Sequence, residues 1–465
     1  MGSTTTRSLG GAENSGINSV RVDGLGLVEL GWKYKSVPAA SHGRSAADYV
    51  ASGVSLGDLQ TPLLTLDAAA MDSNVERMAR WCAEKGVLLA PHGKTTMAPQ
   101  MWRAQLDGGA WGITLANVSQ LRVAHAFGVR RVMLANSLTD PQAINWLANT
   151  QGPDFFVVSW VDSLQTVALQ ELVLDAVPGS VLDIIVELGG EGGRTGVRSI
   201  SGALEVARAV HASKHLRLVG VGGYEGSLAH TADAGALATV DGYLSALKGL
   251  HEQILAEELY APGVDRIVTA GGSAYFDDVV SVLAGCVSDG TQGDEAGGSA
   301  GGERVDVIIR SGAYMVHDDG FYRDISPFAR GGQATAGQPP FASAMHAWAR
   351  VVSQPEPGLA ILDAGKRDMP VDEGMPEPQF LGSELGGSMV ALAGASISAV
   401  NDQHCFLRFD PATTTVNIGD VVRLGLSHPC TAFDKWTLIP VLASTANPGS
   451  PGTGYQVVDL IHTFF

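Results

Sequence analysis

The sequence has few cysteines, few basic residues and no long apolar run, and each shortage excludes a class of protein. Four cysteines in 465 residues cannot form the framework of a small disulfide-stabilised protein. Lys and Arg number 30 against 48 Asp and Glu, so a formal net charge of -18 repels nucleic-acid phosphates. No segment approaches the roughly 18 consecutive apolar residues of a membrane span. We therefore expect reduced thiols and no nucleic-acid or membrane partner.

The N-terminal residues MGSTTTRSLGGAENSG lack the apolar core of a secretory signal. Gly2 and Thr6 match the loose N-myristoylation pattern, but a polar tail accounts for the same residues. Hydrophobic residues make up 45% of the chain, which suffices for a large core and excludes a disordered or fibrous protein. A soluble, cytoplasmic globular protein is the prediction.

Short apolar segments alternate with longer helical patterns between residues 70 and 330. Segments rich in Val, Ile and Leu that are apolar on both faces are typical of parallel strands covered by helices. Eight such segments predict a (β/α)8 barrel. They are 87–92, 109–115, 131–136, 155–160, 182–188, 216–223, 265–272 and 305–312. A helix over 68–85, apolar at Met71, Val75 and Met78, leads into the first strand.

The sequence changes character after residue 335, where short strand-like segments are separated by Gly, Pro, Asn and Asp turns. This pattern predicts a mainly β C-terminal domain, which TPLLTLD (61–67) and residues 18–35 are expected to join as strands. Residues 288–303 are rich in Gly and polar residues and are typical of a flexible surface insertion. The predicted organisation is an N-terminal tail and strands over 1–67, a barrel over 68–334 and a β-domain over 335–465.

Candidate catalytic residues follow the predicted strands, because barrel enzymes carry their chemistry at the carboxyl ends of the strands. The first strand ends in Pro91-His92-Gly93-Lys94; a partly desolvated lysine there can form a Schiff base, while an ordinary solvated lysine fits equally. Arg194, in a Gly-rich loop, can neutralise an oxyanion. Gly271-Gly272-Ser273 precedes a helix, where barrels often hold phosphate, although such a turn is also ordinary loop chemistry. These loops together indicate an anionic cofactor with a phosphate, held covalently by lysine.

A second cluster lies in the predicted β-domain, at Ser427-His428-Pro429-Cys430. An imidazole and a thiolate one residue apart can bind one Zn²⁺ and leave positions open for substrate or water. A buried cysteine beside a hydrogen-bonded histidine explains the same pair. His404 and Cys405 are adjacent strand residues that point to opposite faces, so one ion cannot easily take both. We assign Cys405 to the hydrophobic core and expect His404 to lie next to the metal ligands rather than to bind the ion itself.

The ordered motifs PHGKTTM, GGRTGV, GGYEG, AGGS, RSGAYMVHDD and SHPCTAFDKW resemble those of the D-serine dehydratase and D-threonine aldolase family. The members are fold-type III pyridoxal phosphate enzymes related to alanine racemase, with a barrel and a β-domain. The resemblance runs from about residue 60 to the C-terminus. The ordered set is far more specific than the lysine motif alone.

The resemblance implies a role for each residue of the barrel motifs. Lys94 carries the cofactor as a Schiff base and, once freed, takes the Cα proton of a D-amino acid substrate. Arg194 contacts the phenolic oxygen of the cofactor, and Tyr224 lies near its pyridine nitrogen as a neutral phenol. Gly271, Gly272 and Ser273 bind the phosphate, and Tyr314 lies at the pocket edge.

His428 and Cys430 match the dehydratase branch of the family, in which zinc holds the β-hydroxyl of the substrate and makes it a better leaving group. The aldolase branch typically carries aspartate in place of Cys430 and a harder metal. Because a thiolate favours zinc, the resemblance implies β-elimination from a D-β-hydroxy amino acid. D-Serine would give pyruvate and ammonia. The family also implies a homodimer.

Three other functions remain open on the sequence alone. A D-threonine aldolase would keep Lys94 and the metal but cleave Cα–Cβ and release glycine. A metal-free racemase would not need His428 and Cys430. A pyridoxal phosphate carrier protein, the non-enzymatic alternative, would not need the β-domain. The sequence does not decide among D-serine, D-threonine and 3-hydroxyaspartate as substrates.

Overall fold

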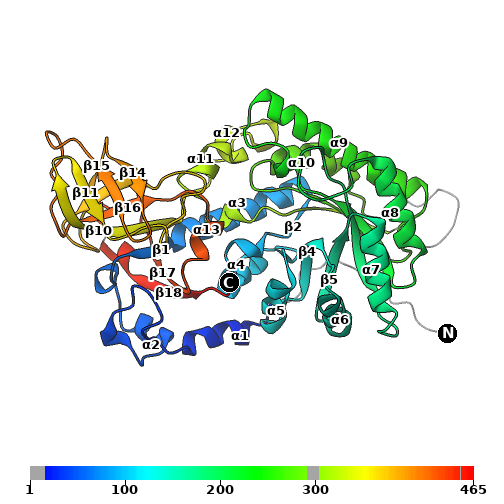
Figure 1. Ribbon diagram of the computed structural model, residues 1–465, viewed down its shortest axis with the longest axis horizontal. Helices are drawn as coiled ribbons and strands as arrows, with labels where there is room; N and C mark the ends of the chain where they lie inside the picture. The colour runs from blue at the N-terminus through cyan, green and yellow to red at the C-terminus, as the bar shows by residue number, and fades with distance from the viewer. Residues whose placement is uncertain (1–15, 291–302, 451) are drawn as a thin grey trace.

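The computed structural model describes residues 16–290, 303–450 and 452–465, which form two sheets with helices around one of them (Figure 1). The first sheet has eight strands in the order β2-β9-β8-β7-β6-β5-β4-β3, and all seven neighbouring pairs are parallel. A parallel bridge between His92 and Thr114 joins the two edges. The predicted barrel is therefore confirmed. Its strands are β2 (Leu88–Leu89), β3 (Ile113–Leu115), β4 (Arg131–Ser137), β5 (Phe156–Val161), β6 (Leu182–Glu187), β7 (Leu216–Gly222), β8 (Arg266–Ala270) and β9 (Val305–Ile309).

Helices cover the outside of the barrel and connect its strands. Six of them begin at an Asp, Asn or Ser side chain that accepts a backbone N–H of the first turn, which ends each loop at a defined residue. The interior is filled by side chains such as Met133, Val158, Ile185 and Ile267, so the barrel is a packed core. The helices are α3 (Ala68–Lys85), α4 (Pro99–Asp107), α5 (Val118–Ala126), α6 (Pro141–Thr150), α7 (Leu164–Leu174), α8 (Ile200–Ala212), α9 (Ala234–Ala256) and α10 (Phe276–Leu283).

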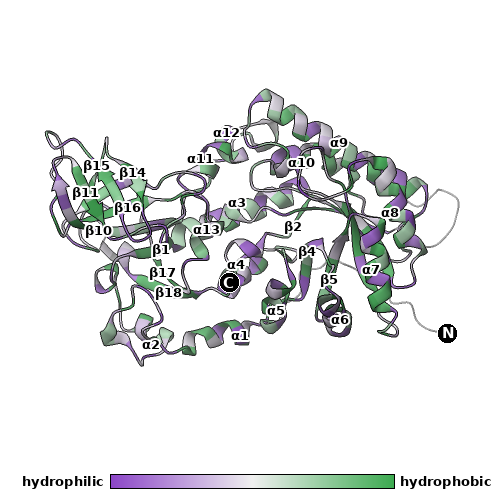
Figure 2. Cartoon of the chain, viewed as in Figure 1, coloured by the Kyte–Doolittle hydropathy of each residue, from purple (hydrophilic) through white to green (hydrophobic). Residues whose placement is uncertain are grey.

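The second sheet has ten strands and is centred on the long strand β10, which pairs with β1, β16 and β11. The segment 61–67 contributes β1 (Leu63–Asp67), which lies between β10 and β17. Apolar residues are concentrated on the strands of this sheet (Figure 2). Its other strands are β10 (Met345–Glu356), β11 (Leu359–Leu362), β12 (Glu377–Gly382), β13 (Val390–Ala391), β14 (Ser396–Val400), β15 (Cys405–Arg408), β16 (Val421–Gly425), β17 (Leu438–Leu442) and β18 (Val457–His462).

Residues 18–35 do not form the predicted strands. Asn18 caps helix α1 (Ser19–Asp23), and a 3-10 turn (Gly24–Leu27) follows it. Arg21 donates to the carbonyl of Ala126 at 2.6 Å, so this helix lies against the barrel rather than in the second sheet. The Asn18 side chain accepts the N–H of Arg21, and this local cap outweighs the β-branched residues of the segment.

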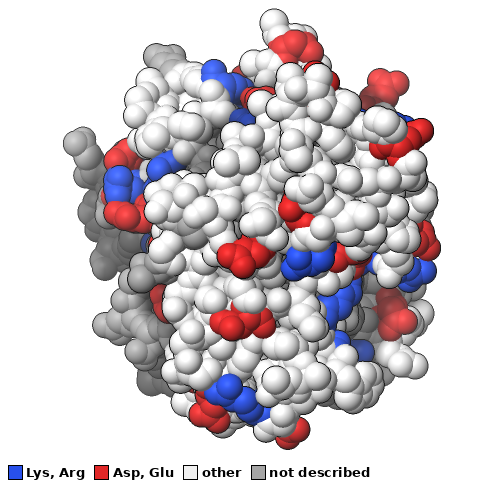
Figure 3. Space-filling model, turned by 90° about the vertical axis from the view of Figure 1, so that its left-hand side faces the viewer, with Lys and Arg blue, Asp and Glu red and all other residues white. Residues whose placement is uncertain are grey.

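The surface carries mixed charges on the end of the molecule that holds the second sheet. On that face, Lys and Arg lie beside Asp and Glu rather than in one patch (Figure 3). None of the helices in the described part of the chain is both long and apolar enough to span a bilayer. Residues 291–302 of the predicted insertion lie outside the described residues.

Candidate active site

A cavity of about 130 Å³ lies at the carboxyl ends of the barrel strands, where a turn of the second sheet meets them. It continues into an outer hollow of about 440 Å³ with which it shares Arg194, Tyr224 and His428. The cavity brings together residues from loops that are far apart in sequence. The predicted site residues that line it are Lys94, Arg194, Tyr224, Gly272, Ser273, His428 and Cys430.

Lys94 lies on a 3-10 turn (Gly93–Thr95) after β2 and lines the cavity. Gly93 makes this turn possible, because a Cβ there would meet Ile113 Cγ2 at 2.4 Å and Trp102 Nε1 at 2.7 Å. The Trp102 indole also donates to the Gly93 carbonyl at 3.0 Å. The close packing of this turn fixes the backbone position of Lys94.

Arg194 and Tyr224 lie together at the rim. The Arg194 guanidinium is 5.2 Å from the centre of the Tyr224 ring, within the range of a cation–π contact. Burial, followed by the nearby charge of Glu225, raises the pKa of Tyr224 to about 12, so its phenol is neutral at pH 7. The loop that carries Arg194 is tied down by Arg198, which donates to four of its carbonyls.

The Gly271-Gly272-Ser273 turn differs from the sequence prediction in its hydrogen bonds. The N–H groups of Gly271 and Gly272 donate to the Glu225 carboxylate, at 3.0 and 2.6 Å. These two N–H groups are therefore engaged by a protein acceptor, and the phosphate role expected for the turn stays a prediction. The Ser273 hydroxyl lines the cavity and accepts the N–H of Ala313 at 3.2 Å.

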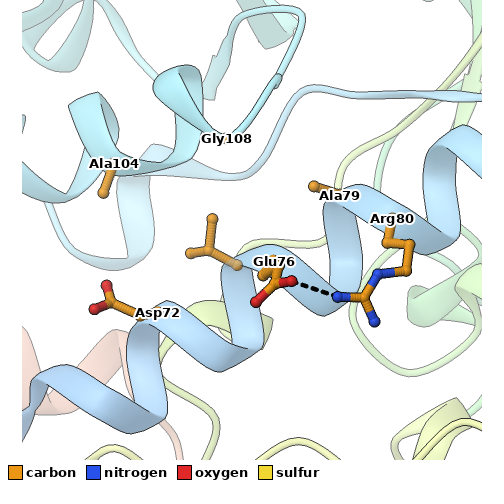
Figure 4. Close-up of a pocket in the computed structure, with 7 residues that line it drawn as sticks. Asp72, Glu76, Ala79, Arg80, Ala104 and Gly108 are labelled. Carbon is orange, nitrogen blue, oxygen red and sulfur yellow. Dashed lines mark hydrogen bonds and ion pairs between the residues drawn. The ribbon is translucent and has the colours of Figure 1, made fainter.

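Tyr314 does not lie at the edge of this cavity. It lies on a 3-10 turn (Ala313–Met315) after β9 and lines a separate hollow of about 230 Å³, together with Cys82 and Gln105. That hollow adjoins a groove between α3 and α4, which is lined mainly by small and charged residues and in which Arg80 pairs with Glu76 (Figure 4). Burial is the main cause that raises the pKa of Tyr314. Tyr314 is thus buried beside this separate hollow, and its predicted place at the edge of the cofactor pocket stays a prediction.

Several cavity residues were not among the predicted site residues, and Arg310 and Tyr322 are two of them. Arg310 is 1% exposed, lies 4.8 Å from the Trp160 ring and donates to Thr269 Oγ1 at 2.5 Å. Tyr322 lines both the cavity and the outer hollow. Arg310 ends a barrel strand, which was a usable signal, whereas nothing in the sequence around Tyr322 marks it.

His428 and Cys430 reach the cavity from the turn before helix α13 (Cys430–Phe433). His428 has φ of 72°, in the left-handed region that a histidine seldom adopts, and its N–H donates to buried Asp318 at 2.9 Å. Its Nδ1 lies 2.6 Å from Asp372 Oδ2. An ionised carboxylate only accepts, so Nδ1 donates to Asp372, and Nε2 is the nitrogen that could bind a metal once it has lost its own proton.

His428 and Cys430 each shift the pKa of the other toward the charged form. Burial opposes charging of His428, but Cys430 and then Asp372 raise its pKa to about 9. Burial likewise opposes ionisation of Cys430, and the pKa of this thiol is nevertheless lowered by His428, Thr95 and Lys94. The Thr95 hydroxyl lies 3.3 Å from Cys430 Sγ, which links the pair to the residue next to Lys94.

This donor set fits a two-ligand zinc site with open positions. A thiolate and an imidazole are common zinc ligands, and catalytic zinc sites keep a position for water or substrate. Among the described residues, no group of three or more His, Cys, Asp or Glu side chains is arranged to hold a metal. His404 lies on an exposed turn and does not line the cavity, and Cys405 is fully buried, as predicted.

Comparison with known families matches both halves of the molecule. The model of the alanine racemase N-terminal domain matches residues 66–270, and that of the "putative serine dehydratase domain" matches residues 344–442. The chain is therefore similar to alanine racemase over the barrel and to the serine dehydratase domain over the second sheet. These matches confirm the resemblance seen in the motifs.

The curated proteins that match this chain are lyases. The D-threonine aldolase of Arthrobacter sp is 26% identical over 383 residues, which cover 82% of this chain and 89% of that enzyme. The D-threo-3-hydroxyaspartate dehydratase of Delftia sp. (strain HT23) is 26% identical over 410 residues, covering 83% and 95%. The crystal structure of D-threonine aldolase from Filomicrobium marinum matches with a TM-score of 0.70 at 22% identity, covering 88% of this chain and 97% of that one. The family fold therefore extends over nearly the whole chain.

Proposed function

We propose that the protein is a lyase that uses pyridoxal phosphate and zinc to eliminate the β-hydroxyl of a D-amino acid, with D-serine converted to pyruvate and ammonia. One observation carries this proposal. Lys94 and the His428–Cys430 pair line the same small cavity, although Lys94 follows a strand of the barrel and the pair follows a strand of the second sheet. A base for the Cα proton and a site for the β-hydroxyl are thus within reach of one small substrate.

The barrel residues fit the cofactor. Bound pyridoxal phosphate supplies an electron sink for the charge that develops at Cα. Lys94 would hold it and then take the Cα proton, with Arg194 and neutral Tyr224 around its ring. Close backbone approach supports this fit, because a Cβ on Gly272 would meet Tyr224 Cε2 at 2.9 Å, and one on Gly312 would meet His92 Cβ at 2.7 Å.

The His428–Cys430 pair fits zinc. A zinc ion held by His428 Nε2 and Cys430 Sγ would act as a Lewis acid toward a substrate hydroxyl. Asp372 keeps the His428 ring in the required tautomer. The D-threo-3-hydroxyaspartate dehydratase has been solved as a Cys-to-Ala mutant in a metal-free form, which supports a metal role for Cys430.

A D-threonine aldolase is the second candidate, because enzymes of that name match this chain in sequence and in fold. The thiolate is the feature that favours elimination, since it selects a softer metal. The two reactions differ in the bond that breaks. Elimination breaks Cβ–O and gives a 2-oxo acid and ammonia, whereas retro-aldol cleavage breaks Cα–Cβ and gives glycine and an aldehyde.

The deciding experiment incubates the holoprotein with D-serine, D-threonine and D-threo-3-hydroxyaspartate and measures 2-oxo acid, ammonia and glycine. Metal is then removed with a chelator, and zinc is restored. Pyruvate from D-serine that is lost on chelation and regained with zinc supports the proposal. Glycine from D-threonine without 2-oxo acid would replace it with the aldolase.

The proposal also includes a homodimer in the cytoplasm and the division into residues 1–67, 68–334 and 335–465. Sedimentation velocity tests the assembly, and cell fractionation tests the location. Limited proteolysis tests the division, because cleavage is expected first at exposed loops between packed units.

A further inference from the structure

Glu225 is a buried carboxylate that the proposed chemistry does not use. Its side chain is 0% exposed, on the 3-10 turn (Glu225–Ser227) that follows β7 and Tyr224. Its two oxygens take the N–H of Gly271 at 3.0 Å and that of Gly272 at 2.6 Å. A buried carboxylate needs such donors, because burial without them is strongly unfavourable. The result is a two-point tie between the loop after β7 and the loop after β8.

The tie sets the relative position of two cavity residues. Gly272 has no room for a side chain, since a Cβ would lie 2.9 Å from the Tyr224 ring and 3.6 Å from Glu225 Oε1. Tyr224 therefore packs directly on the backbone that Glu225 holds. The next residue, Ser273, lines the cavity with its hydroxyl. A shift of this backbone would move both the ring and the hydroxyl.

The charge of Glu225 is balanced on the side of the barrel core. Arg310 is buried beneath the same loops and donates to the Gly223 carbonyl at 2.5 Å. Burial lowers the pKa of Arg310, and Glu225 is first among the charges that oppose this effect. The negative charge of Glu225 is thus compensated by Arg310 and by the N–H dipoles of Gly271 and Gly272.

We propose that Glu225 is a positioning residue for the phosphate end of the cofactor. By engaging the N–H groups of Gly271 and Gly272, it directs Ser273 into the cavity and leaves the phosphate to Ser273 and to the loop after β9. This inference rests on the proposed function and replaces the sequence prediction that the two glycine amides bind phosphate directly. Glu225 itself touches neither substrate nor cofactor.

The test measures the affinity of the full chain, after removal of cofactor, for pyridoxal phosphate and for unphosphorylated pyridoxal by absorbance titration. Glu225→Gln keeps one oxygen acceptor but presents an NH₂ group to the second glycine amide. We expect it to weaken pyridoxal phosphate binding about tenfold or more, as for hydrogen bonds to a charged group. Pyridoxal binding should change by less than about twofold, because that molecule lacks the phosphate. Glu205→Gln, on the exposed face of α8, is the matched control and should change neither affinity.

Glu225→Asp provides a second variant that keeps the charge. Its shorter side chain cannot reach both amides, so we expect the same phosphate-selective loss. Equal losses for both cofactors, in variants that melt at the wild-type temperature, would overturn the inference, and so would unchanged binding. A wild-type chain that binds no pyridoxal phosphate overturns the proposed function together with this inference, whereas wild-type binding with unaffected variants overturns the inference alone.

Discussion

The two halves of the candidate site are held by different means. At the barrel mouth, backbone packing dominates: Gly93 lies against Trp102 and Ile113, and Gly272 lies against Tyr224. The turn of the proposed metal site, which carries His428 and Cys430, depends instead on two carboxylates from distant segments. Asp318, on the loop after β9, holds the backbone of His428, and Asp372 holds its ring.

This difference has a physical consequence. Close backbone contacts are specified by short local motifs, since a glycine leaves no alternative side chain to rearrange. A histidine in the left-handed region is strained and needs neighbours to keep it there. The half that carries His428 and Cys430 should therefore be more sensitive to changes in distant residues than the barrel half, in which Glu225 supplies the long-range contact.

The largest expected effect comes from the barrel half. Lys94→Ala removes the amine that would hold the cofactor and take the proton, and it should lower kcat by at least about a thousandfold. Steady-state kinetics with the best substrate measures this effect, and absorbance shows whether cofactor is retained. Lys366→Ala, at an exposed lysine of the second sheet's domain, should keep wild-type kcat. Substantial activity in the Lys94 variant would remove lysine chemistry from the proposal.

The second largest effect is expected from Cys430→Ala, in the half of the site that is proposed to bind zinc. Loss of the thiolate should reduce bound zinc to a small fraction and lower kcat by about a hundredfold, because a Lewis acid contributes several kcal/mol. Cofactor affinity should be retained, since the barrel loops are untouched. Metal analysis by mass spectrometry, beside kinetics, separates the two halves. Cys286→Ala, at the other partly exposed free thiol, is the control. Zinc at the wild-type level in the Cys430 variant would contradict the assignment.

The barrel half of the site could be predicted largely from the sequence, because short local motifs specify its close backbone contacts. The helix expected over 68–85 is observed as Ala68–Lys85, and the eight strand segments all fall in the barrel. Lys94, Arg194 and Ser273 lie on loops that follow barrel strands, and all three line the cavity. Periodicity and strand order are local properties, and the sequence contains them directly.

The features that the sequence did not reveal are those in which a long-range partner or a turn decides the geometry. Tyr314 follows a barrel strand, but it lies on a 3-10 turn and lines a separate hollow. The amides of Gly271 and Gly272 have an acceptor, Glu225, about 46 residues earlier in the chain, and sequence spacing cannot reveal that contact. Asp372 is likewise 56 positions from His428. Residues such as Glu225 and Asp372, which act through another residue, do not belong to a recognisable sequence motif.

Asp372→Asn tests how far the half that carries His428 and Cys430 depends on distant carboxylates. An amide can still accept from His428 Nδ1, but without charge, so zinc affinity should fall about tenfold. Cofactor affinity should stay at the wild-type value. Zinc competition with a chromophoric chelator gives the constant. Asp434→Asn, at an exposed aspartate just after α13 that pairs with Lys435, serves as control. An unchanged constant would mean that packing alone orients His428.

The smallest expected effect concerns stability rather than activity, and it lies wholly within the barrel. His251 on α9 is 2% exposed and its Nδ1 lies 2.8 Å from the Tyr260 hydroxyl. Burial is the main cause that lowers the pKa of His251 from 6.5 to about 4. The unfolded chain therefore binds a proton that the folded chain rejects between these values, so stability is full above about pH 6.5 and is lost as pH falls toward 4.

At pH 5 this linkage costs the folded state about 2 kcal/mol from His251. His251→Gln should remove that part of the acid dependence, so the free energy of unfolding falls less steeply from pH 7 to pH 5 than in the wild type. Urea unfolding at each pH measures it. His404→Gln, on an exposed turn, should leave the slope unchanged. Parallel slopes for wild type and His251→Gln would show that the buried imidazole is not the proton acceptor, and that the barrel resists acid by its packing alone.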